Sequence, residues 1–80
     1  MKLKRDKLYQ FNDDNWYYAS TSNSEDRNLN YIGIAVKDYQ LRIIMSNSTY
    51  KNLFTIGNII HYNKMDIKRD MKSGKLVKID

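Results

Sequence analysis

The sequence predicts a small, mainly β domain, of class β or α+β, built as a five-stranded barrel with a short helical connector. Apolar residues alternate at period two over residues 31–36 and 41–45, and β-branched or aromatic residues dominate residues 53–62. Residues 16–18 add three consecutive aromatic side chains. These patterns are typical of half-buried strands, whose side chains point alternately to the two faces of a sheet.

Residues 31–45 predict a β-hairpin with its turn at residues 37–40 (KDYQ), although this turn lacks the usual glycine. The core face is expected to consist of six apolar residues: Ile32, Ile34, Val36, Leu41, Ile43 and Met45. The opposite face would carry Tyr31, Gly33, Ala35, Arg42 and Ile44. The small residues on that second face would allow close approach to the backbone.

Residues 53–80 are interpreted as strands. Phe54, Ile56, Ile60 and Tyr62 share one parity, and a shift of the apolar parity to residues 65 and 67 requires an extra residue near positions 63–64. Gly57 indicates a bulge or bend. Residues 70–74 are expected to form a turn with Gly74 at positive φ, and residues 76–79 a final strand.

A helix is the competing interpretation of residues 49–71. Several apolar residues fall roughly at helical spacing, and Ser48 or Thr49 could cap such a helix. Gly57 and three isoleucines between residues 56 and 60 weigh against it, because glycine and β-branched residues are poor helix formers. The strand interpretation is therefore preferred.

The rest of the chain supplies connections and one more strand. Residues 16–21 are expected to form the first strand, with Trp16 in the core, and residues 12–15 (NDDN) a turn before it. Residues 22–28 read as an exposed loop, and residues 46–52 as a connector with a short helical turn. About residues 1–12 are expected to be loosely attached, as a short helix, an edge strand or a frayed end.

Length and composition point to a single domain over residues 1–80, with one modest core. The chain has no Cys and one His, so disulfides and thiolate metal sites are excluded, and neither a metal site nor a cofactor is expected. It has no run of about 18 apolar residues, and no apolar segment follows the basic start at residues 1–5. We therefore expect a soluble intracellular protein without a membrane partner, in a compartment that the sequence does not identify.

Charge is uneven along the chain and suggests a polyanion as partner. Residues 1–40 hold six Lys/Arg and six Asp/Glu, whereas residues 41–80 hold eight and three, which gives the net charge of +5. A basic half of this kind suits nucleic acid. Excess Lys also simply solubilises small domains, and an AT-rich genome would produce the same richness in Lys, Asn, Ile and Tyr.

Catalysis is not expected. His61 has no glycine elbow or other nucleophile context around it, and it is predicted to lie on a strand surface. The carboxylates of Asp13 and Asp14 sit in a turn cluster, where solvation is the usual state. The glycines at 33, 57 and 74 are too scattered to build a phosphate-binding loop.

Residues 56–68 (IGNIIHYNKMDIK), followed by residues 73–76 (SGKL), resemble the second half of an OB-fold. More narrowly, they are similar to the OB domains of telomere-end-binding (protection-of-telomeres) proteins, in which a valine-glycine-aspartate-isoleucine-isoleucine strand start leads to a basic strand and a closing asparagine-glycine-lysine-leucine strand. Residues 30–45 look like strands two and three of that family. Asn58 stands where the family usually has Asp, and the N-terminal part is unlike the family's first strand.

The resemblance implies a helix between strands three and four, and binding of single-stranded nucleic acid by the face of strands two and three and by the loops after strands one and four. Aromatic faces would stack on bases, and Lys or Arg would neutralise phosphates. The expected nucleic-acid-binding residues are Tyr31, Lys37, Tyr39, Arg42, Lys64, Lys68, Arg69, Lys72 and Lys75. Each Tyr also suits the rim of a small core, and residues 64–75 also suit a solvated charged hairpin.

The function predicted from the sequence is therefore a non-catalytic binding module, with single-stranded DNA or RNA as the expected partner. The alternative is a small protein–protein interaction module, such as an assembly subunit, a homodimer or a phage-type inhibitor of a host protein, acting through a sheet edge or an exposed apolar patch. Structured RNA bound by the basic residues is a third reading. A telomeric role would rest on the resemblance alone, because OB-folds host many functions.

Overall fold

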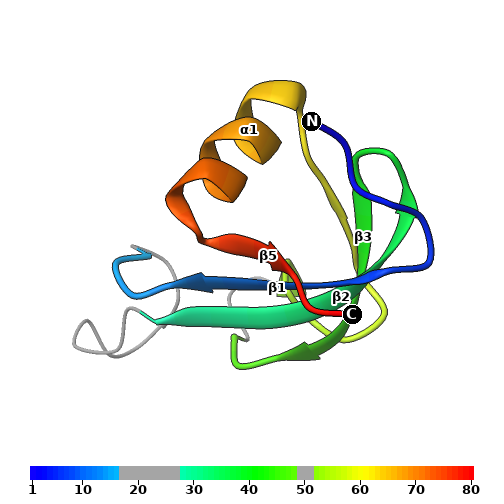
Figure 1. The fold of residues 1–80 in the computed structure, drawn as a ribbon. Coiled ribbons are helices and arrows are strands. Elements are labelled where there is room, and N and C mark those ends of the chain that lie inside the picture. Colours follow the sequence, from blue (N-terminus) through cyan, green and yellow to red (C-terminus); the bar gives the residue numbers. More distant parts are fainter. Residues whose placement is uncertain (17–27, 49–51) are drawn as a thin grey trace.

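The computed structural model describes residues 1–16, 28–48 and 52–80. In this part of the chain, five antiparallel strands form one sheet and a short helix lies against one side of it (Figure 1). The elements are β1 (Leu8–Asp13), β2 (Leu29–Lys37), β3 (Gln40–Ser46), β4 (Ile59–His61), α1 (Lys64–Ser73) and β5 (Leu76–Lys78). The prediction of a mainly β domain with five strands and a short helix is confirmed.

The strand order is β4-β3-β2-β1-β5, and the sheet is not closed because its two edge strands, β4 and β5, do not pair with each other. In the described part of the chain β4 pairs only with β3, and β5 only with β1. The word barrel therefore applies only loosely. The hairpin of β2 and β3 is confirmed: Lys37 lies opposite Gln40, and a two-residue turn joins the strands.

The predicted faces of β2 are reversed. Tyr31 and Ala35 are buried, at 3% and 0% exposure, whereas Ile32, Ile34 and Val36 are only half-buried on the other side. Both faces of β2 are apolar, so its alternation separates two sets of residues without saying which set is covered. The covering elements decide this, because β1 and α1 contribute their apolar side chains to the side of Tyr31.

A register shift corrects the prediction for β3. Leu41 and Ile43 are fully buried as expected, but Met45 is 59% exposed. Gly33 pairs with Ile43 and the next residue back, Ile32, pairs with Met45, which leaves Ile44 as an extra residue. One inserted residue moves the following side chain to the opposite face of the sheet.

The N-terminal segment is an integral part of the fold. The first strand was expected at residues 16–21, of which 17–21 lie outside the described residues, but β1 is Leu8–Asp13 and lies between β2 and β5. Leu3 is 3% exposed, and its backbone N–H donates to the Asp38 carbonyl at 2.8 Å. The expected loose attachment of residues 1–12 is therefore wrong. Trp16, expected in the core, is half-buried and packs against it.

Only the last part of the strand expected over residues 54–62 forms, as the three-residue β4. Phe54 is buried, but Ile56 is 72% exposed because a turn occupies residues 53–57. Gly57 has a φ of +90° and donates its N–H to the Ile43 carbonyl at 2.7 Å, which confirms the expected bend there. Residues 49–51 of the expected helical connector lie outside the described residues.

The strand expected around Met65 and Ile67 is wrong, since these residues lie in α1. The Asn63 side chain accepts a hydrogen bond from the Asp66 N–H at 2.7 Å, and Gly74 ends the helix in the left-handed region with a φ of +81°. Asn and Gly are favoured at these two positions. The long helix considered for residues 49–71 does not form either, because β4 interrupts it.

Helix α1 also lies elsewhere in the order of elements than the OB resemblance implies. It connects β4 to β5, whereas the helix that the resemblance implies between strands three and four would fall in residues 46–52, of which 49–51 lie outside the described residues. Its buried residues are Ile67 and Asp70, and Ile67 joins the hydrophobic core. The final strand is confirmed as β5, which places Leu76 in the core and leaves Val77 and Ile79 exposed.

Candidate functional site

The nine residues expected to bind nucleic acid do not gather on one face of the sheet. Tyr31 is in the hydrophobic core, and Tyr39 packs partly against it. Arg42 lies opposite Ile34 and Ile59, on the side of the sheet away from α1. The other cations of the set lie at the end of β2, on α1 or just after α1: Lys37, Lys64, Lys68, Arg69, Lys72 and Lys75.

Helix α1 does bring part of the predicted site together. Lys64, Lys68 and Lys72 are exposed and stand four residues apart, which places them along one side of the helix. Among the described residues, none of the three makes an ion pair. This row of three lysines is the part of the predicted site that stays open to an anionic partner.

Arg69 and Lys75 are engaged within the chain. Arg69 Nε lies 3.0 Å from Asp70 Oδ1, and its terminal nitrogen lies 3.2 Å from Asp66 Oδ1. The hydrogen bond that Arg69 donates to Asp70 raises the pKa of the Arg69 guanidinium. Lys75 Nζ lies 3.4 Å from Asp13 Oδ2. These two cations therefore contribute less to an external anion than their number in the sequence suggests.

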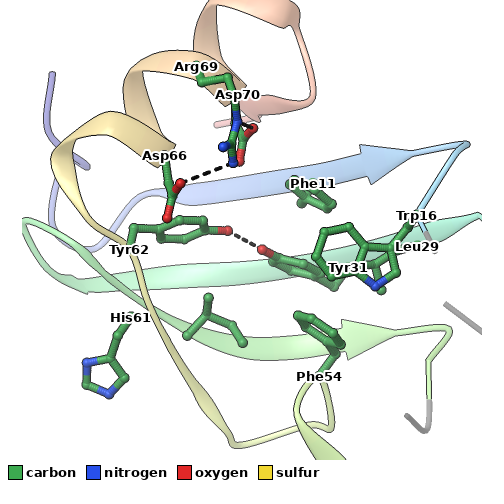
Figure 2. Close-up of a pocket in the computed structure, with 11 residues that line it drawn as sticks. Phe11, Trp16, Leu29, Tyr31, Phe54, His61, Tyr62, Asp66, Arg69 and Asp70 are labelled. Atoms are coloured by element: carbon green, nitrogen blue, oxygen red, sulfur yellow. Dashed lines mark hydrogen bonds and ion pairs between the residues drawn. The ribbon is translucent and has the colours of Figure 1, made fainter. Parts of the chain in front are cut away.

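Four aromatic side chains, those of Phe11, Trp16, Tyr31 and Phe54, pack together in one cluster of the core (Figure 2). The rings of Phe11, Tyr31 and Phe54 form a continuous stack, with centroids 5.0 and 5.6 Å apart. Trp16 meets Phe11 and Phe54 edge-on, at 6.3 and 5.9 Å. Both faces of Tyr31 are thus occupied, so it has no face left on which a base could stack.

A small cavity of about 160 Å³ opens beside this cluster, between the aromatic rings and α1 (Figure 2). The Tyr31 and Tyr62 hydroxyls hydrogen-bond to each other in its wall. Burial raises the pKa of both tyrosines above the usual range, and the neighbouring phenol adds to the rise at Tyr31. Both hydroxyls therefore stay neutral and serve to satisfy each other inside the core.

The side of the sheet away from α1 carries a surface that sequence reasoning assigned to the core. Directly opposed residues of neighbouring antiparallel strands share a face. Two rows of four residues define the outer sheet face. The first row runs from β5 through β1 and β2 to β3 and consists of Val77, Gln10, Ile32 and Met45. The second row runs from β1 through β2 and β3 to β4 and consists of Leu8, Ile34, Arg42 and Ile59.

Six of the eight residues of the outer sheet face are apolar. Met45 and Val77 are 59% and 47% exposed. A hollow of about 170 Å³ opens on this face, with Ile32 and Met45 in its lining and the side chains of Gln10, Asn30 and Asn47 around them. Arg42 is exposed and makes no ion pair with the described residues.

Other chemistry finds little support in the described part of the chain. It contains no group of three or more His, Cys, Asp or Glu side chains placed to hold a metal ion. None of its helices is long and apolar enough to cross a membrane. His61 lies exposed on β4, as expected.

Sequence and fold were also compared with known proteins. No family model, curated protein or solved structure matches this chain. The outer sheet face and the lysine row of α1 must therefore be judged on their own chemistry.

Proposed function

We propose that this chain is a protein-binding module and that the outer sheet face is its docking surface. The observation that carries the proposal is the apolar character of both sides of β2, where Ile32 and Ile34 alternate with the buried Tyr31 and Ala35. An antiparallel sheet with one solvated face normally alternates apolar with polar residues. A sheet with two apolar faces is instead suited to being covered on both.

The partner that fits this surface is a different protein with an apolar contact and an acidic side chain. The hollow around Ile32 suits an apolar side chain of the partner. Arg42 stands in the same face and suits a carboxylate. A second copy is less suitable, because the chain carries a net charge of +5 and repels itself.

The test compares two methionine substitutions that introduce the same charge. Met45→Glu lies on the outer sheet face, and Met65→Glu lies on α1, where the side chain is 80% exposed. Proteins retained from a cell extract by the wild-type chain would be purified, and each would be titrated calorimetrically against the wild type, Met45→Glu and Met65→Glu. We expect at least about a tenfold loss of affinity for Met45→Glu, because it removes apolar contact and repels an acidic partner.

Two results would contradict the docking proposal. One is a purified partner that binds Met45→Glu as well as it binds the wild type. The other is a wild-type chain that forms a stable dimer through this face in sedimentation experiments, since the partner would then be a second copy.

Binding of single-stranded nucleic acid is a second candidate function, supported by the lysine row of α1. Three exposed lysines without ion pairs can neutralise successive phosphates, and binding should weaken steeply with salt. Fluorescence anisotropy with single-stranded DNA, single-stranded RNA and duplex at two salt concentrations tests this. A double variant, Lys64→Ala with Lys68→Ala, should weaken binding without unfolding, and unchanged affinity would remove both residues from the site.

A further inference from the structure

The free side of β5 offers a second place where the chain can bind a partner. Asn12 donates its N–H to the Lys75 carbonyl at 2.8 Å, and Ile79 donates to the Leu8 carbonyl at 2.9 Å. In an antiparallel ladder alternate residues direct their backbone groups to the same side. Leu76 and Lys78 therefore direct their N–H and C=O groups away from β1, where no described strand pairs with them.

A groove of about 370 Å³ runs beside this edge, between the N-terminal segment, α1 and β5. We call it the β5 groove, and its lining residues are Lys2, Lys4, Tyr9, Met71, Leu76, Val77 and Lys78. Figure 1 shows β5 lying along β1, with α1 and the N-terminal segment on one side. The lining combines an apolar surface with three lysines and contains no carboxylate.

The three lysines are only weakly compensated within the chain. Lys4 makes no ion pair with the described residues, and the Lys2 ammonium lies 3.8 Å from Asp38, which Arg5 also approaches at 4.0 Å. The Lys78 ammonium lies 2.9 Å from the main-chain oxygen of Asp80 and makes no ion pair with the side-chain carboxylates of the described residues. The groove is therefore a positively charged site beside a row of backbone groups that a further strand could pair with.

We propose that the β5 groove binds an extended acidic peptide of another protein, which adds to the sheet as a strand beside β5. Backbone hydrogen bonds to Leu76 and Lys78 would supply the pairing, and carboxylates would meet the three lysines. Side chains of the added strand alternate, so acidic residues at every second position would face the lysines together. Pairing with β5 of a second copy is disfavoured because it would bring Lys78 of each chain close to the other.

The probe is a short fluorescein-labelled peptide of alternating Glu and Val, titrated by anisotropy. We expect binding to the wild-type chain that weakens between about 0.05 and 0.3 M salt. Replacing Lys4 and Lys78 by Glu should weaken it at least about tenfold. The matched control, Lys68→Glu with Lys72→Glu, makes the same change in net charge on α1 and should keep the affinity within about threefold.

A second measurement separates strand addition from charge attraction alone. The same peptide, N-methylated at alternate residues so that it cannot pair with β5, should bind at least about tenfold more weakly. In hydrogen exchange, the amides of Leu76 and Lys78 should gain protection on binding of the unmodified peptide. Equal binding of the methylated peptide, equal losses from both pairs of Glu substitutions, or unchanged exchange at Leu76 and Lys78 would overturn the proposal.

The β5 groove shares Val77 with the outer sheet face but contains none of Ile32, Met45 and Arg42, which carry the docking proposal, so this inference does not depend on that proposal. Met45→Glu should leave binding of the Glu-Val peptide unchanged, and the Lys4 and Lys78 substitutions should leave binding at the outer sheet face unchanged. A result that removes one site therefore leaves the other standing.

Discussion

Gly33 shows how closely the strands of this sheet approach each other at a single residue. A Cβ atom built there would lie 2.5 Å from Leu41 Cγ and 2.7 Å from the Arg42 carbonyl oxygen. We expect Gly33→Ala to lower the free energy of unfolding by about 1–3 kcal/mol, because a backbone oxygen cannot rotate away as a side chain can. This exceeds the roughly 0.4–1 kcal/mol that an alanine gains by restricting the unfolded chain. Urea denaturation measures the difference.

The matched control for this substitution is Arg42→Ala, on the neighbouring strand. Arg42 is exposed and makes no ion pair with the described residues, so its loss should change stability by less than about 0.5 kcal/mol. A Gly33→Ala protein as stable as Arg42→Ala would show that the strands can separate at no cost.

The buried tyrosine pair should make stability fall in alkaline solution. Burial raises the pKa of Tyr31 and of Tyr62, so the folded chain keeps protons that the unfolded chain loses above about pH 10. Below that pH the contribution of the pair is fully present. Above it, the free energy of unfolding should fall by up to about 1.4 kcal/mol per pH unit for each tyrosine.

Urea denaturation at a series of pH values from about 9 to 11.5 tests this, with Tyr31→Phe combined with Tyr62→Phe as the comparison. The double variant should show a shallower fall, since the remaining tyrosines and the lysines are common to both proteins. Parallel curves would mean that the two phenols ionise in the folded chain as readily as in the unfolded one.

The sequence identified which residues of β2 share a face, but not which face is covered. Tyr31 was assigned to an exposed binding surface, and Ile32 and Ile34 to the core, and the reverse holds. Phe11, which stacks on Tyr31, lies in a segment expected to be loosely attached. The spacing of Tyr9 and Phe11, two apart, was the signal that could have identified β1 and with it the covered side.

At the scale of elements, the cap of α1 should be measurable. The Asn63 side chain accepts a hydrogen bond from the Asp66 N–H. This N–H lies in the first turn of α1, so no preceding turn supplies a carbonyl for it. We expect Asn63→Ala to lower the free energy of unfolding by about 1 kcal/mol, measured by urea denaturation followed by circular dichroism. Asn63→Asp keeps an oxygen acceptor and should stay within about 0.5 kcal/mol of the wild type. Equal loss in both variants would contradict a capping role.

Both ends of α1 were present in the sequence as Asn63 and Gly74, yet the segment was interpreted as a strand with a turn. A ten-residue helix contains few apolar residues, and here only Ile67 and Met71 face the core. Two apolar residues are too few to establish a helical spacing in the sequence. The hairpin was predictable because alternation is repeated within both of its strands. The helix was missed because tertiary burial, more than local periodicity, stabilises it.

At the scale of the whole molecule, the residues of the predicted site lie on different sides of the fold. The prediction relied on the number of cations and aromatic residues along the chain, which does not show which of them share a surface. The strand order places Arg42 and the lysines of α1 on opposite sides of the sheet, and it buries Tyr31. Only three-dimensional pairing shows that Lys4 and Lys78, 74 positions apart, line one groove. The β5 groove could therefore not be predicted from the spacing of residues in the sequence.

The two ends of the sequence hold the fold together, so damage at β5 should affect the whole molecule. Leu76 is 2% exposed and lies opposite Phe11, which stacks on Tyr31 in the centre of the core.

We expect Leu76→Ala to lower the free energy of unfolding by about 2–5 kcal/mol. Because β5 pairs with β1, an inner strand of the sheet, Trp16 fluorescence and far-ultraviolet circular dichroism should still report one coincident urea transition. Val77→Ala, at an exposed neighbour, is the control and should cost less than about 1 kcal/mol. Two separate transitions in Leu76→Ala would show that β5 can detach while the sheet stays folded.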